Sequence, residues 1–137
     1  MAEYTKPLPV PDPLTKHYWD SVKSHAMQIQ NCAACAKFVF YPRSVCPHCG
    51  SRDLHWTAVS GKGKVYGFAI SYQKSMPGFG AEVPYTIATV ELEEGVRLMT
   101  NLVGIAPDPA QIKVGMDVVV QYDDVTEAVT LPKFRPA

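Results

Sequence analysis

All four cysteines of this chain lie between residues 31 and 50, as two Cys-x-x-Cys pairs with ten residues between them: Cys32/Cys35 and Cys46/Cys49. Each pair directs two sulfur atoms toward one point, and two facing pairs give a tetrahedral site of four thiolates, which suits Zn²⁺ and also a single iron ion. Nothing else in the sequence indicates electron transfer. We therefore expect a structural Zn²⁺ rather than iron or two disulfides, with His48 as an exposed loop residue rather than a ligand.

A site of four thiolates leaves no ligand position for water or substrate, so the metal itself is not expected to be catalytic. The histidines show no pairing pattern with a serine, cysteine or carboxylate that would indicate a triad. Gly61-Lys-Gly-Lys64 looks like a phosphate loop but lacks the P-loop spacing and a following helix, so a β-turn is the expectation there. The sequence therefore predicts no catalytic residues and no autonomous enzyme.

Before the cysteines, residues 1–13 are rich in proline and predict an extended arm. Asp12 as N-cap and Pro13 in the first helical position predict a helix from Pro13 to His25. Its apolar face either packs on its own domain or docks, with the arm, on another protein. The candidate interface residues on this helix are Tyr18, Trp19 and Val22.

After Trp56 the sequence changes to β character. We expect strands at residues 64–72, 84–92, 96–103, 117–122 and 127–131, mostly antiparallel, in a small closed or half-closed barrel. The loop between the first two strands contains Met76 and Phe79. It either folds onto the barrel rim or forms a lip that contacts a ligand or partner.

Composition restricts the class of partner. The 137 residues are 47% apolar, and 13 Lys+Arg balance 13 Asp+Glu, so the formal net charge is zero. Because nucleic-acid binders usually carry a basic excess, this balance disfavours nucleic acid. The sequence shows neither a signal peptide nor an apolar run long enough for a membrane span, so we expect a cytoplasmic protein without a membrane partner.

In order and spacing, the motifs of this chain resemble one family. They are Tyr18-Trp19, Cys32-x-x-Cys35, Tyr41-Pro42-Arg43, Cys46-Pro47-x-Cys49, Trp56, Gly61-x-Gly63, Pro84-Tyr85, Gly115-x-x-Val118 and Phe134-x-Pro136. Together they are similar to the acyl-CoA-associated family of rubredoxin-like zinc ribbon plus OB-fold proteins, filed as domain of unknown function thirty-five. The resemblance spans nearly the whole chain, and the cysteine pattern is its most specific part.

The resemblance implies a mainly β fold: an N-terminal arm and helix over residues 1–30, a rubredoxin-like zinc ribbon over 31–57 and a five-stranded OB-fold barrel over 58–137. It also implies an accessory role. Members of the family associate with thiolase-superfamily enzymes, and some accompany or are fused to enoyl-CoA hydratases. The chain would then be a non-catalytic subunit of a hetero-oligomer that helps bind a CoA thioester and seals the partner's substrate channel.

Side-chain chemistry and position, rather than matched family positions, supply the candidate contacts with CoA. Arg43, Lys62 and Lys64 are candidates for its phosphates, and Phe79 and Tyr85 for pantetheine or adenine. The lip adds Met76 and Phe79 to the candidate partner interface.

Two other functions stay open. Zinc ribbons and OB-folds also bind nucleic acid, and Tyr66, Phe68 and Tyr72 have the even spacing of one strand face, either a base-stacking platform or core. The third possibility is a scaffold subunit that never contacts CoA.

Overall fold

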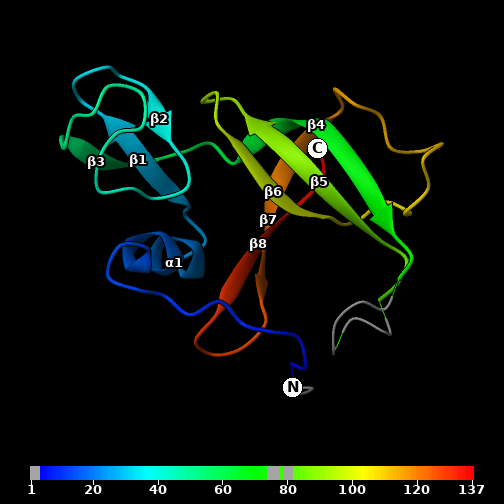
Figure 1. The fold of residues 1–137 in the computed structure, drawn as a ribbon. Helices are drawn as coiled ribbons and strands as arrows, with labels where there is room; N and C mark the ends of the chain where they lie inside the picture. The colour runs from blue at the N-terminus through cyan, green and yellow to red at the C-terminus, as the bar shows by residue number, and fades with distance from the viewer. Residues whose placement is uncertain (1–3, 74–77, 79–81) are drawn as a thin grey trace.

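The computed structural model describes residues 4–73, 78 and 82–137. Among these residues, one helix precedes eight strands, labelled in Figure 1, with these bounds: α1 Lys16–Lys23, β1 Gln28–Cys32, β2 Phe38–Val39, β3 Leu54–Ala58, β4 Lys62–Ser71, β5 Tyr85–Leu92, β6 Arg97–Leu102, β7 Asp117–Asp124 and β8 Thr130–Pro136. Helix and strands thus follow the predicted mainly β order. Within the described part of the chain, no helix is long and apolar enough to cross a membrane.

The helix is shorter than predicted. α1 begins at Lys16, not Pro13, and Thr15 is its N-cap. Asp12 lies one turn earlier, where its carboxylate accepts a hydrogen bond from the Thr15 N–H at 2.8 Å while the Thr15 hydroxyl accepts one from the Asp12 N–H at 3.1 Å. The residues recognised as a capping signal therefore form a turn that leads into the helix, and the helix itself ends at Lys23.

The first sheet is the ribbon, with strand order β2-β1-β3 and both pairings antiparallel. Gln30 in β1 is buried and binds the following loop twice. Its side-chain amide donates to the Arg43 carbonyl at 2.8 Å, and its amide oxygen accepts from the Arg43 N–H at 2.7 Å. This reciprocal pair satisfies a buried polar side chain and fixes the loop that leads to the second cysteine pair.

The second sheet is a closed barrel with strand order β4-β5-β6-β8-β7, and β4 pairs with β7 to close it. The pairing of β6 with β8 is parallel, at Leu102 and Phe134, and the other barrel pairings are antiparallel. Its interior is mainly apolar, with Phe134, Val90 and Ala88 fully buried. A closed barrel of five strands agrees with the predicted OB-fold.

Two predicted local structures are wrong. Gly61-Lys-Gly-Lys64 is not a β-turn: β4 begins at Lys62, and a Cβ on Gly63 would lie 2.5 Å from the Glu91 carbonyl oxygen of β5. This glycine permits close strand packing rather than phosphate binding. The last strand begins at Thr130 instead of residue 127, because Val129 closes the turn by accepting hydrogen bonds from the Val125 and Thr126 N–H groups.

A β-bulge in β4 separates the aromatic residues predicted to share one face. The register with β5 shifts between Val65 and Gly67. Tyr66 is therefore exposed on the outside of the barrel, where the guanidinium of Arg97 lies 3.8 Å from its ring centroid. Phe68 packs against the barrel core instead. Because a bulge reverses the alternation of side chains, the even spacing in the sequence did not correspond to one continuous platform.

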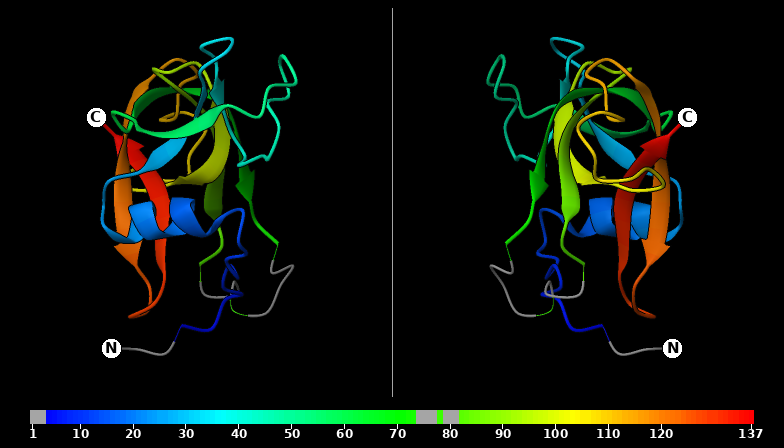
Figure 2. Two further views of the ribbon diagram at one scale, coloured as in Figure 1. Left: turned by 90° about the vertical axis from the view of Figure 1, so that its left-hand side faces the viewer. Right: turned by 90° about the vertical axis from the view of Figure 1, so that its right-hand side faces the viewer.

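Helix α1 lies beside both sheets (Figures 1 and 2) and contacts β1, β7 and β8. Val22 is completely buried and Tyr18 is 6% exposed, in a cluster with Met27 and Ile29. This corrects the hypothesis that Tyr18 and Val22 face a partner, since their side chains join the ribbon to the barrel within the chain. Trp19 is partly buried at the edge of the same cluster.

Candidate metal centre and surface hollows

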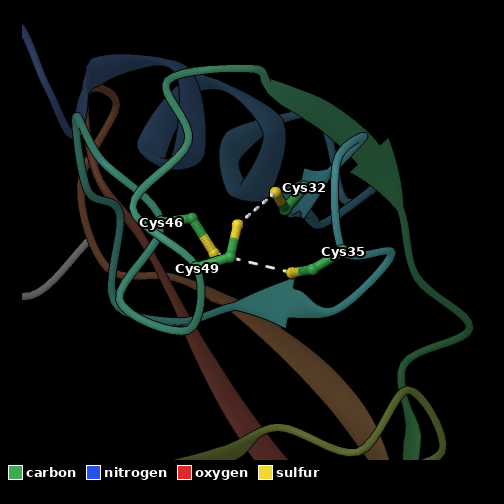
Figure 3. A group of neighbouring side chains, drawn as sticks. All are labelled: Cys32, Cys35, Cys46 and Cys49. Atoms are coloured by element: carbon green, nitrogen blue, oxygen red, sulfur yellow. Dashed lines mark hydrogen bonds between the residues drawn. The ribbon is translucent and has the colours of Figure 1, made fainter.

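The four cysteines come together at one end of the ribbon (Figure 3). Cys32 ends β1, Cys35 lies in the turn before β2, and Cys46 and Cys49 lie in the loop between β2 and β3. All four sulfur atoms lie within 4.8 Å of one another. Cys32 and Cys49 are 3.6 Å apart and Cys35 and Cys46 3.8 Å, close to the ~3.8 Å between ligands of a tetrahedral zinc with Zn–S bonds of about 2.3 Å.

The two Cys-x-x-Cys turns have the same backbone geometry. In the first, the Cys32 carbonyl accepts from the Ala36 N–H at 2.7 Å. In the second, the Cys46 carbonyl accepts from the Gly50 N–H at 2.9 Å. Ala36 and Gly50 both adopt positive φ, 65° and 80°. Two equivalent turns facing each other present two sulfur atoms each, which is the arrangement that a tetrathiolate metal ion requires.

Local hydrogen bonds favour a thiolate at the first ligand. The Cys35 N–H is the main cause that lowers the pKa of the Cys32 thiol to about 7, although burial opposes it. The His48 N–H donates to the Cys46 sulfur at 3.4 Å. His48 itself is exposed and does not belong to the described group of potential ligands. The donor set is therefore four sulfurs, which fit zinc and fill its coordination sphere.

Three hollows on the surface bear on ligand binding. One of about 350 Å³ lies where the ribbon meets the barrel, between α1, the loop after β2, β6 and β8. We call it the junction hollow. Its lining is largely apolar and includes Trp19, Tyr41, Pro42, Met99 and Lys133. Tyr41 and Met99 are 55% and 65% exposed, so two large apolar side chains here remain open to solvent.

The candidate CoA contacts do not converge on the junction hollow. Lys62 and Lys64 line a larger hollow of about 750 Å³ beside β4 and β7, where Lys64 pairs with Asp117 at 2.6 Å. Tyr85 lines a third hollow of about 260 Å³ at the end of the barrel. Arg43 is exposed in the ribbon and lines none of these three. Phe79 and Met76 lie outside the described residues.

Comparison with known proteins identifies the family. Residues 19–55 match the model for the ChsH2 rubredoxin-like zinc ribbon domain, and residues 56–123 match the model for the ChsH2 C-terminal OB-fold domain. A DUF35 domain-containing scaffold protein from Pyrococcus furiosus is 32% identical over 125 residues, which are 87% of this chain and 90% of that one. The chain belongs to the DUF35 family.

Other relatives carry enzyme names. A probable enoyl-CoA hydratase alpha subunit from Thermomonospora curvata is 44% identical over 120 residues, 88% of this chain but 36% of that one. The chain therefore spans about a third of the length of that relative. The solved structure of an Ltp2-ChsH2(DUF35) aldolase contains a chain that is 40% identical, with a TM-score of 0.83 over 94% of this chain and 98% of that one.

Of the residues that line the junction hollow of this DUF35 protein, sequence reasoning selected Tyr18 and Trp19 but missed Tyr41, Pro42, Met99 and Lys133. Tyr41 and Pro42 stand in a quoted family motif, which was a usable signal. The sequence signal for Met99 was weaker. Met99 follows the buried Leu98 in β6, and neighbouring residues of a strand face opposite sides, so Met99 had to face outward. No sequence signal identified Lys133, since the predicted last strand ended before this residue.

Proposed function

We propose that this protein is a non-catalytic, zinc-containing accessory subunit of an acyl-CoA enzyme: an aldolase, a hydratase or a related thiolase-superfamily enzyme. The match to nearly the whole of a chain in the Ltp2-ChsH2(DUF35) aldolase carries this proposal, because 40% identity with a TM-score of 0.83 spans ribbon and barrel together. The hydratase alpha subunit supports the same class of partner. Reduced, metal-binding cysteine pairs favour a cytoplasmic setting.

The chemistry would belong to the partner. Cys32, Cys35, Cys46 and Cys49 would hold Zn²⁺ with four thiolates, so the ion would fix the fold of the ribbon and present no open position to a substrate. The best-supported contribution of this chain is shape: a ribbon and a barrel held at a fixed angle by α1, with apolar side chains exposed between them.

We infer that the junction hollow contributes to the CoA-thioester channel in the complex. Its exposed apolar side chains, Tyr41 and Met99, suit the pantetheine or acyl part of the ligand or the partner's surface around it. Trp19 at its edge keeps a place in the proposed partner interface. Arg43, Lys62, Lys64, Phe79 and Tyr85 stay proposals as CoA contacts, and their dispersal favours contact with different parts of a long ligand or of the partner.

Gentle purification of the tagged protein from its native cells, followed by mass spectrometry, tests the proposal. A stoichiometric thiolase-like, aldolase or hydratase subunit is the expected result. The purified complex should then bind a CoA thioester more tightly than either subunit does. Recovery of nucleic acid or ribosomal proteins, without a CoA enzyme, would overturn the proposal in favour of base recognition by the barrel.

A further inference from the structure

The N-terminal arm is seated on the barrel. Residues 4–11 run beneath α1 and past the hairpin between β7 and β8 toward the end of the barrel (Figures 1 and 2). Near α1, Pro9 and Pro11 line a small hollow with Trp19 and with residues 128–130 of that hairpin. The arm therefore contacts the helix at one end and approaches the β4–β5 connection at the other.

The far end of the arm is held by charge. Lys6 Nζ lies 2.6 Å from Glu82 Oε2, and the Lys6 side chain is only 13% exposed against 46% for Glu82. Lys6 also lines the hollow of about 260 Å³ at the end of the barrel, together with Lys133 and Asn101. Burial lowers the pKa of Lys6, but the hydrogen bond with Glu82 and nearby negative charge outweigh it and raise the pKa.

Gly78 lets the backbone of the arm come close to the connection between β4 and β5. Gly78 has φ +87°, and a Cβ at this position would lie 2.7 Å from the Thr5 carbonyl oxygen and 2.9 Å from the Lys6 nitrogen. Any side chain here would collide with the backbone of the arm. The backbone of the arm therefore lies against Gly78 at this point.

The rest of the arm is weakly held. Among the backbone hydrogen bonds recorded between described residues, none joins residues 5–11 to the barrel. Prolines at positions 7, 9 and 11 remove donors and keep the segment extended. Val10 is 88% exposed, so it contributes little burial. Seating of the arm therefore depends strongly on the Lys6 end.

We propose that residues 4–11 form a strap over the hollow at the end of the barrel and that the Lys6–Glu82 ion pair is its latch. With the latch closed, Lys6 forms part of the wall of the hollow. With it open, the strap leaves as an extended chain hinged at Asp12, and the hollow opens toward solvent beside Lys133 and Asn101. These two residues also line the junction hollow, so an open strap gives the junction a second approach from the barrel end.

Backbone ¹⁵N relaxation of Thr5, Leu8 and Val10 tests the latch in the full-length zinc-loaded protein. With the latch closed, these amides should have clearly higher order parameters than in Glu82→Ala, where they should fall below about 0.6, the range of flexible backbone. Raising the salt from about 0.02 to 1 M should move the wild type toward the variant, because screening weakens the ion pair. Gly78→Ala should also release the strap by collision.

Asp117→Ala is the matched control, because it breaks the Lys64–Asp117 pair of the same 2.6 Å length away from the strap. Its strap amides should keep the wild-type order parameters, and the amide of Ala88 in the barrel core should stay rigid in every variant. A wild-type strap that is already flexible at low salt, or a strap equally rigid in Glu82→Ala, would overturn the proposal. Both results are independent of whether the protein binds CoA.

Discussion

The phenol oxygen of Tyr122 in β7 accepts a hydrogen bond from the backbone N–H of Met27, at 2.9 Å. Met27 immediately precedes β1, so this single contact joins the entry of the ribbon to the wall of the barrel. The same Tyr122 ring stacks on His25 with a centroid distance of 5.0 Å. The relative placement of the two sheets, and hence the junction hollow, depends on this contact and on the helix cluster beside it.

Tyr122→Phe should therefore destabilise the protein. The ring can stay in place, but the Met27 N–H loses its acceptor, and an unsatisfied buried donor costs about 1–3 kcal/mol. Thermal unfolding should show a melting temperature lower by roughly 4–12 °C. Tyr66→Phe is the control. Tyr66 is 52% exposed, so the free energy of unfolding of this variant should lie within about 0.5 kcal/mol of the wild-type value. Equal stability of both variants would contradict the assigned role of Tyr122.

Metal removal should unfold the ribbon and spare the barrel. Cys46→Ser, or a strong chelator, is expected to abolish binding of one zinc ion per chain. Because zinc binding by four thiolates supplies much of the free energy that folds such small units, the ribbon should unfold. Val39 packs with the cysteines, whereas Val90 lies in the separate barrel core. Methyl NMR should show the Val39 signal lost and the Val90 signal dispersed.

His48→Ala is the control for the metal centre. Its backbone N–H, which donates to the Cys46 sulfur, survives the substitution, so zinc content by elemental analysis should be unchanged. Loss of zinc in this variant would make His48 a ligand. Iron in place of zinc would correct the expected metal.

Alkaline pH should destabilise the fold through the phenols of the buried Tyr18 and the half-buried Tyr122. Burial raises the pKa of Tyr18 and of Tyr122 above the ordinary value of 10.0, although the Met27 N–H partly opposes it at Tyr122. The folded state therefore keeps these phenols neutral while the unfolded chain ionises them. Their contribution is complete below about pH 10 and is lost as pH rises toward the folded pKa values, by up to about 1.4 kcal/mol per pH unit for the buried Tyr18 and by less for the half-buried Tyr122, where solvent screens the charge.

Denaturant unfolding at several pH values between 9 and 12 measures this slope. Tyr18→Phe should be less sensitive to alkaline pH than the wild type, whatever its stability at pH 7. The phenolate absorbance of the wild type should include a component that rises only as the protein unfolds. An identical pH slope in Tyr18→Phe and the wild type would show that Tyr18 ionises equally well in the folded state.

A charge in the junction hollow should weaken assembly or ligand binding without affecting the fold. Met99 is 65% exposed and lines the hollow, so Met99→Lys should leave the melting temperature almost unchanged. In the complex with its partner, we expect at least a tenfold loss of CoA-thioester or partner affinity. Val114→Lys is the matched control, because Val114 is 66% exposed and lines none of the described hollows. Equal effects of both substitutions would remove the junction hollow from the proposed function.

The metal centre could be predicted from sequence because its chemistry is local. Within Cys32-x-x-Cys35 the turn itself places two sulfurs together, and the second pair repeats the same turn. The barrel strands were predicted nearly as well, since β5 alternates strictly between buried and half-buried residues. Periodicity of two identifies such a strand whatever it pairs with.

Features that depend on a partner strand could not be predicted. The bulge between Val65 and Gly67 appears only against β5. The aromatic residues of the apparent face differ in exposure: Tyr66 and Tyr72 are exposed, whereas Phe68 is partly buried against the core. The later end of the turn, at Val129, is likewise set by two hydrogen bonds across the hairpin. Propensity carries no information on either, because pairing rather than residue type decides them.

By itself, then, the sequence determined the four-cysteine centre, the mainly β order and the family, because short-range spacing and motif order encode them. Only the tertiary structure decided which apolar side chains are available for function. Tyr18 and Val22 have the same apolar character as Met99, yet the first two join ribbon to barrel and the third faces solvent. The exposure of a residue depends on which distant residues pack against it in the fold, and its neighbours along the chain do not determine these contacts.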